Sequence, residues 1–197
     1  MFGLLSKVLT IALATQVAAL PVENAAVEKR AQNVIIGYRT VSSAQAQRYI
    51  EAGTLTDDGN AIGTQIGAGV YTTPNPGGWS GNADSWYCCI MAEDTGLNAL
   101  NKVKIPQSFS GTKLWFGGDS AIDNYITTVV PGADPKKTLR ISKIDGQEST
   151  LQMVIPPALL NANGGGLAIS LSCAKDLADI PSSVVNYDSW TKVFGSP

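Results

Sequence analysis

The chain has 197 residues, which is an ordinary length for one domain. Only 15% of the residues are charged and the net charge is -2, which argues against a nucleic-acid binder because such proteins carry a basic surplus. The sequence has no histidine, so Ser-His-Asp and Cys-His nucleophile systems are excluded, and three cysteines without histidine rarely form a catalytic zinc site.

The N-terminus has the pattern of a secretory signal peptide over residues 1–19. Lys7 precedes an apolar run that is shorter than the ~20 residues needed to span a membrane, and small residues follow at the cleavage positions. Residues 20–30 are interpreted as a propeptide, because they end in a Lys-Arg pair of the kind cleaved in fungal secreted proteins. We therefore expect a secreted, extracellular protein whose mature domain is residues 31–197.

The three cysteines predict one disulfide, since oxidising compartments favour bridge formation. Cys173 has to take part, because a bridge between the adjacent Cys88 and Cys89 would be strained. Adjacent residues of a strand face opposite sides, so either Cys88 or Cys89 can meet Cys173, but not both.

The first predicted elements are a strand and a helix. Residues 34–39 are rich in β-branched side chains and predict a central strand. A helix is predicted over residues 42–52, because Ser42 and Gln45 have capping-box spacing and Gly53 suits the C-terminal cap. Its predicted apolar face consists of Ala46, Tyr49 and Ile50.

The remaining predicted elements are short. Residues 55–69 are interpreted mostly as loop, residues 84–87 as a helical turn, and residues 119–126 as a helix capped by Asp119 or Ser120. Half-buried or buried strands are predicted at residues 70–73, 89–92, 100–105, 139–144, 151–155 and 167–173. Short strands with two or three helices indicate a single α+β domain.

One set of residues has the chemistry of a ligand site. An arginine on a central strand can hold an anion, glycines allow close approach to the backbone, and tyrosine and threonine offer a ring face and hydroxyls. These candidates are, in chain order, Arg39, Gly67, Gly69, Tyr71, Thr72 and Thr73. The structural alternative is a satisfied arginine, a glycine turn and core aromatics.

The order of these features resembles the secreted ADP-ribosyltransferases of the toxin type, such as heat-labile enterotoxin A. The resemblance rests on Tyr38-Arg39 at the end of the first strand, the following helix, Gly-x-Gly-x-Tyr-x-Thr at residues 67–73, and an aromatic pair before a buried strand. It implies a split β-sheet sandwich with a cleft for NAD as substrate, and no metal. Arg39 would contact NAD phosphate or ribose and Tyr71 the nicotinamide, while Thr72 or Thr73 would support the catalytic acid.

The third motif departs from the pattern of that family. Active members carry a glutamate near the start of the strand that ends in the proline turn, and a strand beginning at residue 151 places Gln152 there. Glutamine can bond a hydroxyl but supplies no negative charge. Glu148 lies on the same face but about 13 Å away in a regular strand, so it could replace Gln152 only if a bulge or loop brought it back.

Three functions follow from the sequence. The first is a secreted ADP-ribosyltransferase-like protein that transfers ADP-ribose from NAD or hydrolyses NAD, acting on a host or competitor molecule. The second is a catalytically inactive secreted effector or binding module on the same fold, which binds a nucleotide-like ligand, or a protein through the aromatic-rich residues 79–87. The third is a small secreted surface protein without a ligand. No nucleic-acid or membrane partner is expected.

Overall fold

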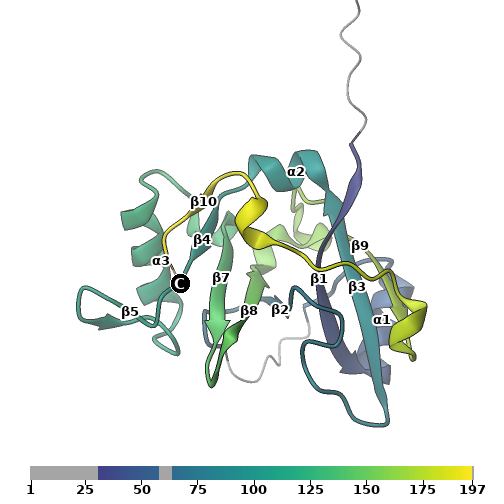
Figure 1. The fold of residues 1–197 in the computed structure, drawn as a ribbon. Coiled ribbons are helices and arrows are strands. Elements are labelled where there is room, and N and C mark those ends of the chain that lie inside the picture. Colours follow the sequence, from purple (N-terminus) through teal and green to yellow (C-terminus); the bar gives the residue numbers. More distant parts are fainter. Residues whose placement is uncertain (1–30, 58–63, 197) are drawn as a thin grey trace, which may run out of the picture. The chain divides into compact units, whose positions relative to one another are not determined.

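Two main β-sheets organise the chain (Figure 1). The structure is a computed structural model, and it describes residues 31–57 and 64–196. Residues 31–197 cluster as one unit, with three α-helices among the described residues. The expectation of a single domain that mixes helices and sheets is confirmed. The predicted signal peptide and propeptide lie outside the described residues.

The smaller of the two main sheets has three antiparallel strands in the order β1-β3-β9. Its strands are β1 (Asn33–Ser42), β3 (Ser85–Glu93) and β9 (Ser170–Ala174). Helix α1 (Ser43–Ala52) contacts β1, β3 and β9, so it covers one face of this sheet.

The larger sheet has five strands in the order β10-β4-β7-β8-β2. Its strands are β2 (Val70–Thr72), β4 (Lys102–Lys104), β7 (Leu139–Ile144), β8 (Gln147–Ile155) and β10 (Val193–Phe194). The two sheets meet where β1 bridges the end of β2: the backbone N–H groups of Tyr38 and Thr73 each donate to the other residue's carbonyl at 2.9 Å.

The remaining elements connect these strands. They are α2 (Asp94–Ala99), α3 (Asp119–Val129), the hairpin β5 (Ser108–Phe109) and β6 (Thr112–Lys113), and short 3₁₀ turns at Pro135–Lys137, Pro157–Leu159, Asn161–Asn163, Leu177–Asp179 and Tyr187–Ser189. No helix in the described part of the chain is long and apolar enough to cross a membrane.

Helix α1 begins and ends where the sequence predicts. The Ser42 Oγ accepts a hydrogen bond from the Gln45 N–H at 3.2 Å, and Gly53 closes the helix with φ +63°. The Gln45 side chain, however, donates to Thr56 Oγ1 instead of completing the capping box. The predicted apolar face is also narrower than expected, because Ile50 is 44% exposed.

Several other boundaries differ from the prediction. Residues 84–87 are not a helical turn, because β3 starts at Ser85 and pairs with β1 along its whole length. Helix α2 was not predicted. Helix α3 is preceded by Gly118 and has no side-chain cap, since the carboxylate of Asp119 bonds elsewhere. Strand β8 starts at Gln147, four residues before the predicted start, and β9 starts at Ser170.

Strand β7 is buried on both faces, whereas the sequence predicts a half-buried strand. Arg140 and Ser142 alternate with the apolar Leu139 and Ile141, and all four are buried. The alternation misleads because the polar side chains find partners inside the protein: Arg140 forms ion pairs, and Ser142 joins a cluster of amide side chains.

Two apolar cores lie on the two faces of the five-stranded sheet. The larger core takes side chains from both sheets, including Ile36 and Ile90 from the smaller sheet and Met153 from β8. The smaller core packs Ile122 and Ile126 of α3 against the opposite face. Each fully buried side chain of this size contributes roughly 1.5–3 kcal/mol, so burial in these cores holds the two sheets and α3 together.

The disulfide joins Cys88 of β3 to Cys173 of β9, which are register partners in neighbouring strands. The two cysteines are 85 positions apart in sequence. In the chain-entropy model a bridge over such a loop adds about 4–5 kcal/mol to the free energy of unfolding. Cys89 is the free cysteine and is buried, and this burial raises the pKa of its thiol to about 11. The thiol is therefore unreactive at neutral pH.

Lys102, the first residue of β4, is a buried lysine whose ammonium group lies at the C-terminal end of α2. Its ammonium group donates to the carbonyl oxygens of Leu97 and Leu100, where a helix end leaves carbonyls without intrahelical partners. Burial, with a smaller effect of the Lys192 charge, lowers the pKa of Lys102 to about 8.

Lys102 should therefore make stability depend on pH. Between the folded-state pKa near 8 and the unfolded value of 10.5, the unfolded chain holds a proton that the folded chain lacks. Raising the pH through this interval favours the folded state, by up to about 1.4 kcal/mol per pH unit. Urea unfolding of the wild type and Lys102→Met should show their stability difference shifting in favour of the wild type from pH 8 to 9.5. A difference that is constant with pH would contradict this.

Candidate functional site

The strands that carry the three sequence motifs are neighbours in the structure. Strand β1 carries Arg39 and bridges the end of β2 at Tyr38 and Thr73. Strand β2 pairs with β8, with Thr72 opposite Met153. Segments up to 85 residues apart in sequence therefore pair directly, and β2 lies between β1 and β8.

Arg39 is held against helix α1. Its Nη1 donates to the Tyr49 hydroxyl at 2.5 Å, and the guanidinium carbon lies 5.8 Å from the centre of the Tyr49 ring. Tyr49 is fully buried, so it offers a fixed partner. Arg39 is opposite Cys88 in the β1–β3 register, and Cys88 is opposite Cys173. The arginine thus shares a sheet face with the disulfide and with α1.

Both glycines before β2 are required by close packing inside the protein. A Cβ atom at Gly67 would lie 1.9 Å from Arg140 Nη1, and one at Gly69 would lie 2.4 Å from the Ile155 carbonyl oxygen. Both residues also have positive φ, +92° and +144°. Glycine is therefore needed at both positions for the packing and backbone conformation of the fold.

Tyr71 lies in the smaller core and closes the turn before it. Its hydroxyl donates to the Gly67 carbonyl at 2.8 Å and accepts from the Ile66 N–H at 2.9 Å. The side chain is only 7% exposed, and burial raises its pKa. The sequence suggested a ring face for stacking a ligand, but in the structure the ring packs among apolar side chains.

The hydroxyls of Thr72 and Thr73 also bond within the protein. Thr72 Oγ1 donates to the Met153 carbonyl at 3.3 Å, and Thr73 Oγ1 donates to the Asn75 carbonyl at 3.0 Å. Both residues are buried. Their hydroxyls fasten β2 to β8 and to the following turn.

An ion cluster centred on Arg140 was missed by the sequence reasoning. Arg140 is 1% exposed; its Nη1 donates to Asp119 Oδ1 at 2.9 Å and its Nη2 to Asp123 Oδ1 at 3.2 Å. Although burial alone would raise the pKa of Asp119, hydrogen bonds from Arg140 and from the Ala68 N–H hold it below the usual value. No sequence signal indicated this burial, because the alternation along residues 139–144 puts Arg140 on the face expected to be exposed.

Gln152 is buried in a cluster of polar side chains rather than exposed in a cleft. It is 3% exposed, and its Nε2 donates to Gln65 Oε1 at 2.8 Å and to Ser142 Oγ at 3.2 Å. Gln65, which the sequence reasoning did not single out, is the centre of this cluster. Its position after a loop, next to the glycine motif, gave no signal of burial.

Glu148 is exposed near the start of β8, where the strand is irregular. Lys143 pairs with Leu151, yet the next residue of β7, Ile144, pairs with Gln147. In a regular ladder the β7 partners of residues 147 and 151 would be four residues apart, but here the partners are adjacent residues of β7. The register therefore skips residues 148–150, so Glu148 lies in a bulge of β8 that has no partner on β7.

A protein-family match covers the part of the chain from the glycine motif to the C-terminal strands. Residues 64–196 match a family of unknown function, DUF5910. The chain belongs to this family. The span matched by DUF5910 contains the glycine motif, Gln65 and β8, whereas Arg39 and α1 lie before it. The search of curated proteins gives no match.

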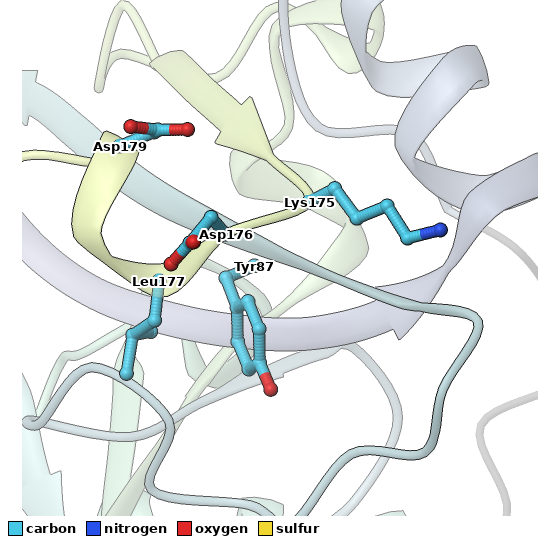
Figure 2. Close-up of a pocket in the computed structure, with 5 residues that line it drawn as sticks. All are labelled: Tyr87, Lys175, Asp176, Leu177 and Asp179. Atoms are coloured by element: carbon cyan, nitrogen blue, oxygen red, sulfur yellow. The ribbon is translucent and has the colours of Figure 1, made fainter.

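The DUF5910 span also contributes a surface pocket at the end of β9. It has a volume of about 540 Å³ and is lined by Tyr87, Lys175, Asp176, Leu177 and Asp179. Figure 2 shows the Tyr87 ring beside Leu177, with the Lys175 side chain extending away from the two aspartates. Tyr87 ends the aromatic-rich segment at residues 79–87. The pocket includes none of the candidate residues for NAD.

Metal-binding side chains do not gather anywhere in residues 31–57 or 64–196. No group of three or more histidine, cysteine, aspartate or glutamate side chains is placed to hold an ion there. The two aspartates around Arg140 bond its guanidinium instead.

Gly67 should be intolerant of any side chain. Gly67→Ala adds a Cβ within 1.9 Å of Arg140 Nη1 as well as backbone strain at φ +92°. Gly132 is a matched control, because it has φ +84° and no atom within 4 Å of a Cβ. We expect Gly132→Ala to cost about 1–2 kcal/mol from strain alone, and Gly67→Ala to cost at least about 2 kcal/mol more. Equal losses in thermal or urea unfolding would contradict the packing argument.

Proposed function

We propose that this protein is a secreted ADP-ribosyltransferase-like enzyme that cleaves NAD. ADP-ribose passes to a host or competitor molecule, or to water. The observation that carries the proposal is the adjacency of three strands. Strand β1 carries Arg39 and bridges the end of β2, where the threonine pair lies, and β2 pairs with β8, which carries Glu148 near its start.

Glu148, rather than Gln152, is the proposed catalytic acid. Strand β8 ends at Ile155 before the proline pair, and it begins at Gln147, so the glutamate near its start is Glu148. The irregular register supports this assignment, because a bulge at residues 148–150 is what the role of Glu148 requires. The side-chain amide of Gln152 is hydrogen-bonded to Gln65 and Ser142, which gives this residue a structural role.

The proposed reaction breaks the bond between the ribose C1′ atom and the nicotinamide nitrogen. The bonding electron pair leaves with nicotinamide, and positive charge develops on the ribose. The Glu148 carboxylate accepts a hydrogen bond from a ribose hydroxyl and stabilises that charge. The oxygen of water or of an acceptor then bonds to C1′ and releases a proton. Arg39 holds an NAD phosphate or ribose through its guanidinium.

A binding module without catalysis is the second candidate. It is favoured by the hydroxyls of Tyr71, Thr72 and Thr73, which bond within the fold and so leave little polar surface on β2 for a ligand. In that case the protein binds a nucleotide-like ligand beside Arg39, or a protein through the segment at residues 79–87. The two candidates differ in whether nicotinamide is released.

Glu148→Gln should abolish most NAD cleavage. The variant keeps the shape of the side chain but removes the charge, and loss of one well-placed electrostatic group costs about 100- to 1,000-fold in kcat. Nicotinamide release from NAD by the mature chain, at high protein concentration, measures this. Asp145→Asn is the matched control, because it removes an exposed carboxylate of the same hairpin.

The outcomes of that assay separate the candidates. Release by the wild type and by Asp145→Asn, with loss in Glu148→Gln, supports the enzyme. Release that is unchanged in Glu148→Gln contradicts the role of Glu148. No release by the folded wild type contradicts the enzyme and leaves the binding module.

Arg39→Ala should weaken NAD binding whether or not the protein is catalytic. The guanidinium offers charge-assisted hydrogen bonds, each of which contributes about 1.5–3 kcal/mol, so we expect the dissociation constant to rise at least about tenfold. Calorimetric titration of NAD into both proteins tests this. Arg48→Ala is a control on the exposed face of α1. Equal NAD affinities of the wild type and Arg39→Ala would show that the ligand does not bind at Arg39 of β1.

A further inference from the structure

Gln65 is a buried glutamine whose side chain is saturated with hydrogen bonds. Its Nε2 donates to the Lys143 carbonyl at 2.8 Å and to Ser142 Oγ at 3.5 Å. Its Oε1 accepts from the Asp145 N–H at 3.0 Å and from Gln152 Nε2 at 2.8 Å. An amide has two donor hydrogens and two acceptor lone pairs, so all four positions are used.

The partners of Gln65 flank the irregularity in the β7–β8 hairpin. Lys143 is the last residue of β7 that pairs in the regular register, and Asp145 begins the turn into β8. Residues 148–150 have no partners in that register. The ladder is thus interrupted where Glu148 lies, and Gln65 supplies hydrogen bonds at the same place from another part of the chain.

Gln65 is itself fixed to the rest of the fold. Its carbonyl accepts from the Phe116 N–H at 2.8 Å, and the next residue, Ile66, donates its N–H to the Tyr71 hydroxyl. Ile66 is fully buried in the smaller core. Gln65 therefore connects the hairpin to β2 and to the segment before α3, and it is not carried by the hairpin.

We propose that Gln65 is a positioning residue for Glu148. It holds the end of β7 and the turn in the irregular register, and this register sets the position of Glu148 relative to the ligand that Arg39 would hold. The inference rests on the proposed function, since it assigns a role to Glu148. Gln152 and Ser142 complete the cluster by fixing the orientation of the Gln65 amide.

The experiment compares Gln65→Leu with Gln45→Leu. Gln45 is a matched control because it is also buried, at 4% exposed, and forms its side-chain bonds with Thr56 and Arg48, away from the hairpin. Two readouts are taken on the mature chain: kcat and KM for nicotinamide release from NAD, and hydrogen exchange of the Asp145 amide.

We expect Gln65→Leu to lower kcat about 100-fold, because misplacement of a catalytic group by an ångström has an effect of this size. KM for NAD should change less than about threefold, since Arg39 stays in place. The Asp145 amide should exchange at least about tenfold faster once its acceptor is lost. Gln45→Leu should leave both readouts near the wild type, and in a Glu148→Gln background Gln65→Leu should lower kcat no further.

Gln65→Glu keeps the proposal testable if Gln65→Leu does not fold. This nearly isosteric change retains the acceptor for Asp145 but removes both Nε2 donors. We expect a loss in kcat of about tenfold, between the wild type and Gln65→Leu. An unchanged kcat in the folded Gln65→Glu variant overturns the positioning role.

The remaining outcomes are also decisive. If the wild type cleaves NAD and Gln65→Leu cleaves it equally well, the positioning role fails and the proposed function stands. The positioning role also fails if Gln45→Leu loses as much kcat as Gln65→Leu, because the effect is then general loss of stability. If the folded wild type releases no nicotinamide, the proposed function fails and the role of Gln65 in it fails too.

Discussion

Two backbone hydrogen bonds between Tyr38 and Thr73 join the two sheets, and the rest of the structure depends on this contact. A single bridge fixes the spacing of β1 and β2 at one point, but it leaves the two sheets free to diverge on either side of that point. The C-terminal segment braces the bridge: the Tyr38 hydroxyl bonds both the N–H and the carbonyl of Ser183 at 2.8 Å, and the Val185 N–H donates to the Pro74 carbonyl. Residues on both sides of the join are thereby tied to a third segment, so the spacing of β1 and β2 is set by more than one short contact.

The five-stranded sheet is built around buried polar groups as well as apolar ones. Arg140 of β7 forms ion pairs with two aspartates of α3 and donates to the Ile66 carbonyl next to the glycine motif. It thereby connects α3 and the glycine motif to β7. Gln65 connects the same region to the β7–β8 hairpin. Because a buried polar group without a partner is costly, such networks tolerate few alternative registers. This explains how an irregular ladder between β7 and β8 can persist as a defined conformation.

Local signals predicted α1 well, because its N-cap bond and C-terminal glycine are contacts between residues close in sequence. The start of β8 was missed because its first residues are polar and exposed, and the register shift there is set by Gln65, some 80 residues earlier. A strand start at residue 151 put Gln152 near the beginning of the strand, whereas Glu148 is the acidic residue near the observed start. The burial of Arg140 and Tyr71 could not be predicted either, since their hydrogen-bond partners are brought near only by the tertiary fold. The choice between Cys88 and Cys89 needed the strand register.

The disulfide also has a topological consequence. Strands β4, β7 and β8 and helices α2 and α3 all lie between Cys88 and Cys173, inside one covalent loop. The exposed tip of the β5–β6 hairpin, at Ser110 and Gly111, is part of that loop. A protease that cut the chain at this tip would produce two fragments that stay joined as one molecule, and both cores could remain assembled. In an extracellular setting rich in proteases, a single nick would then leave the molecule intact, whereas reduction followed by the same nick would separate it.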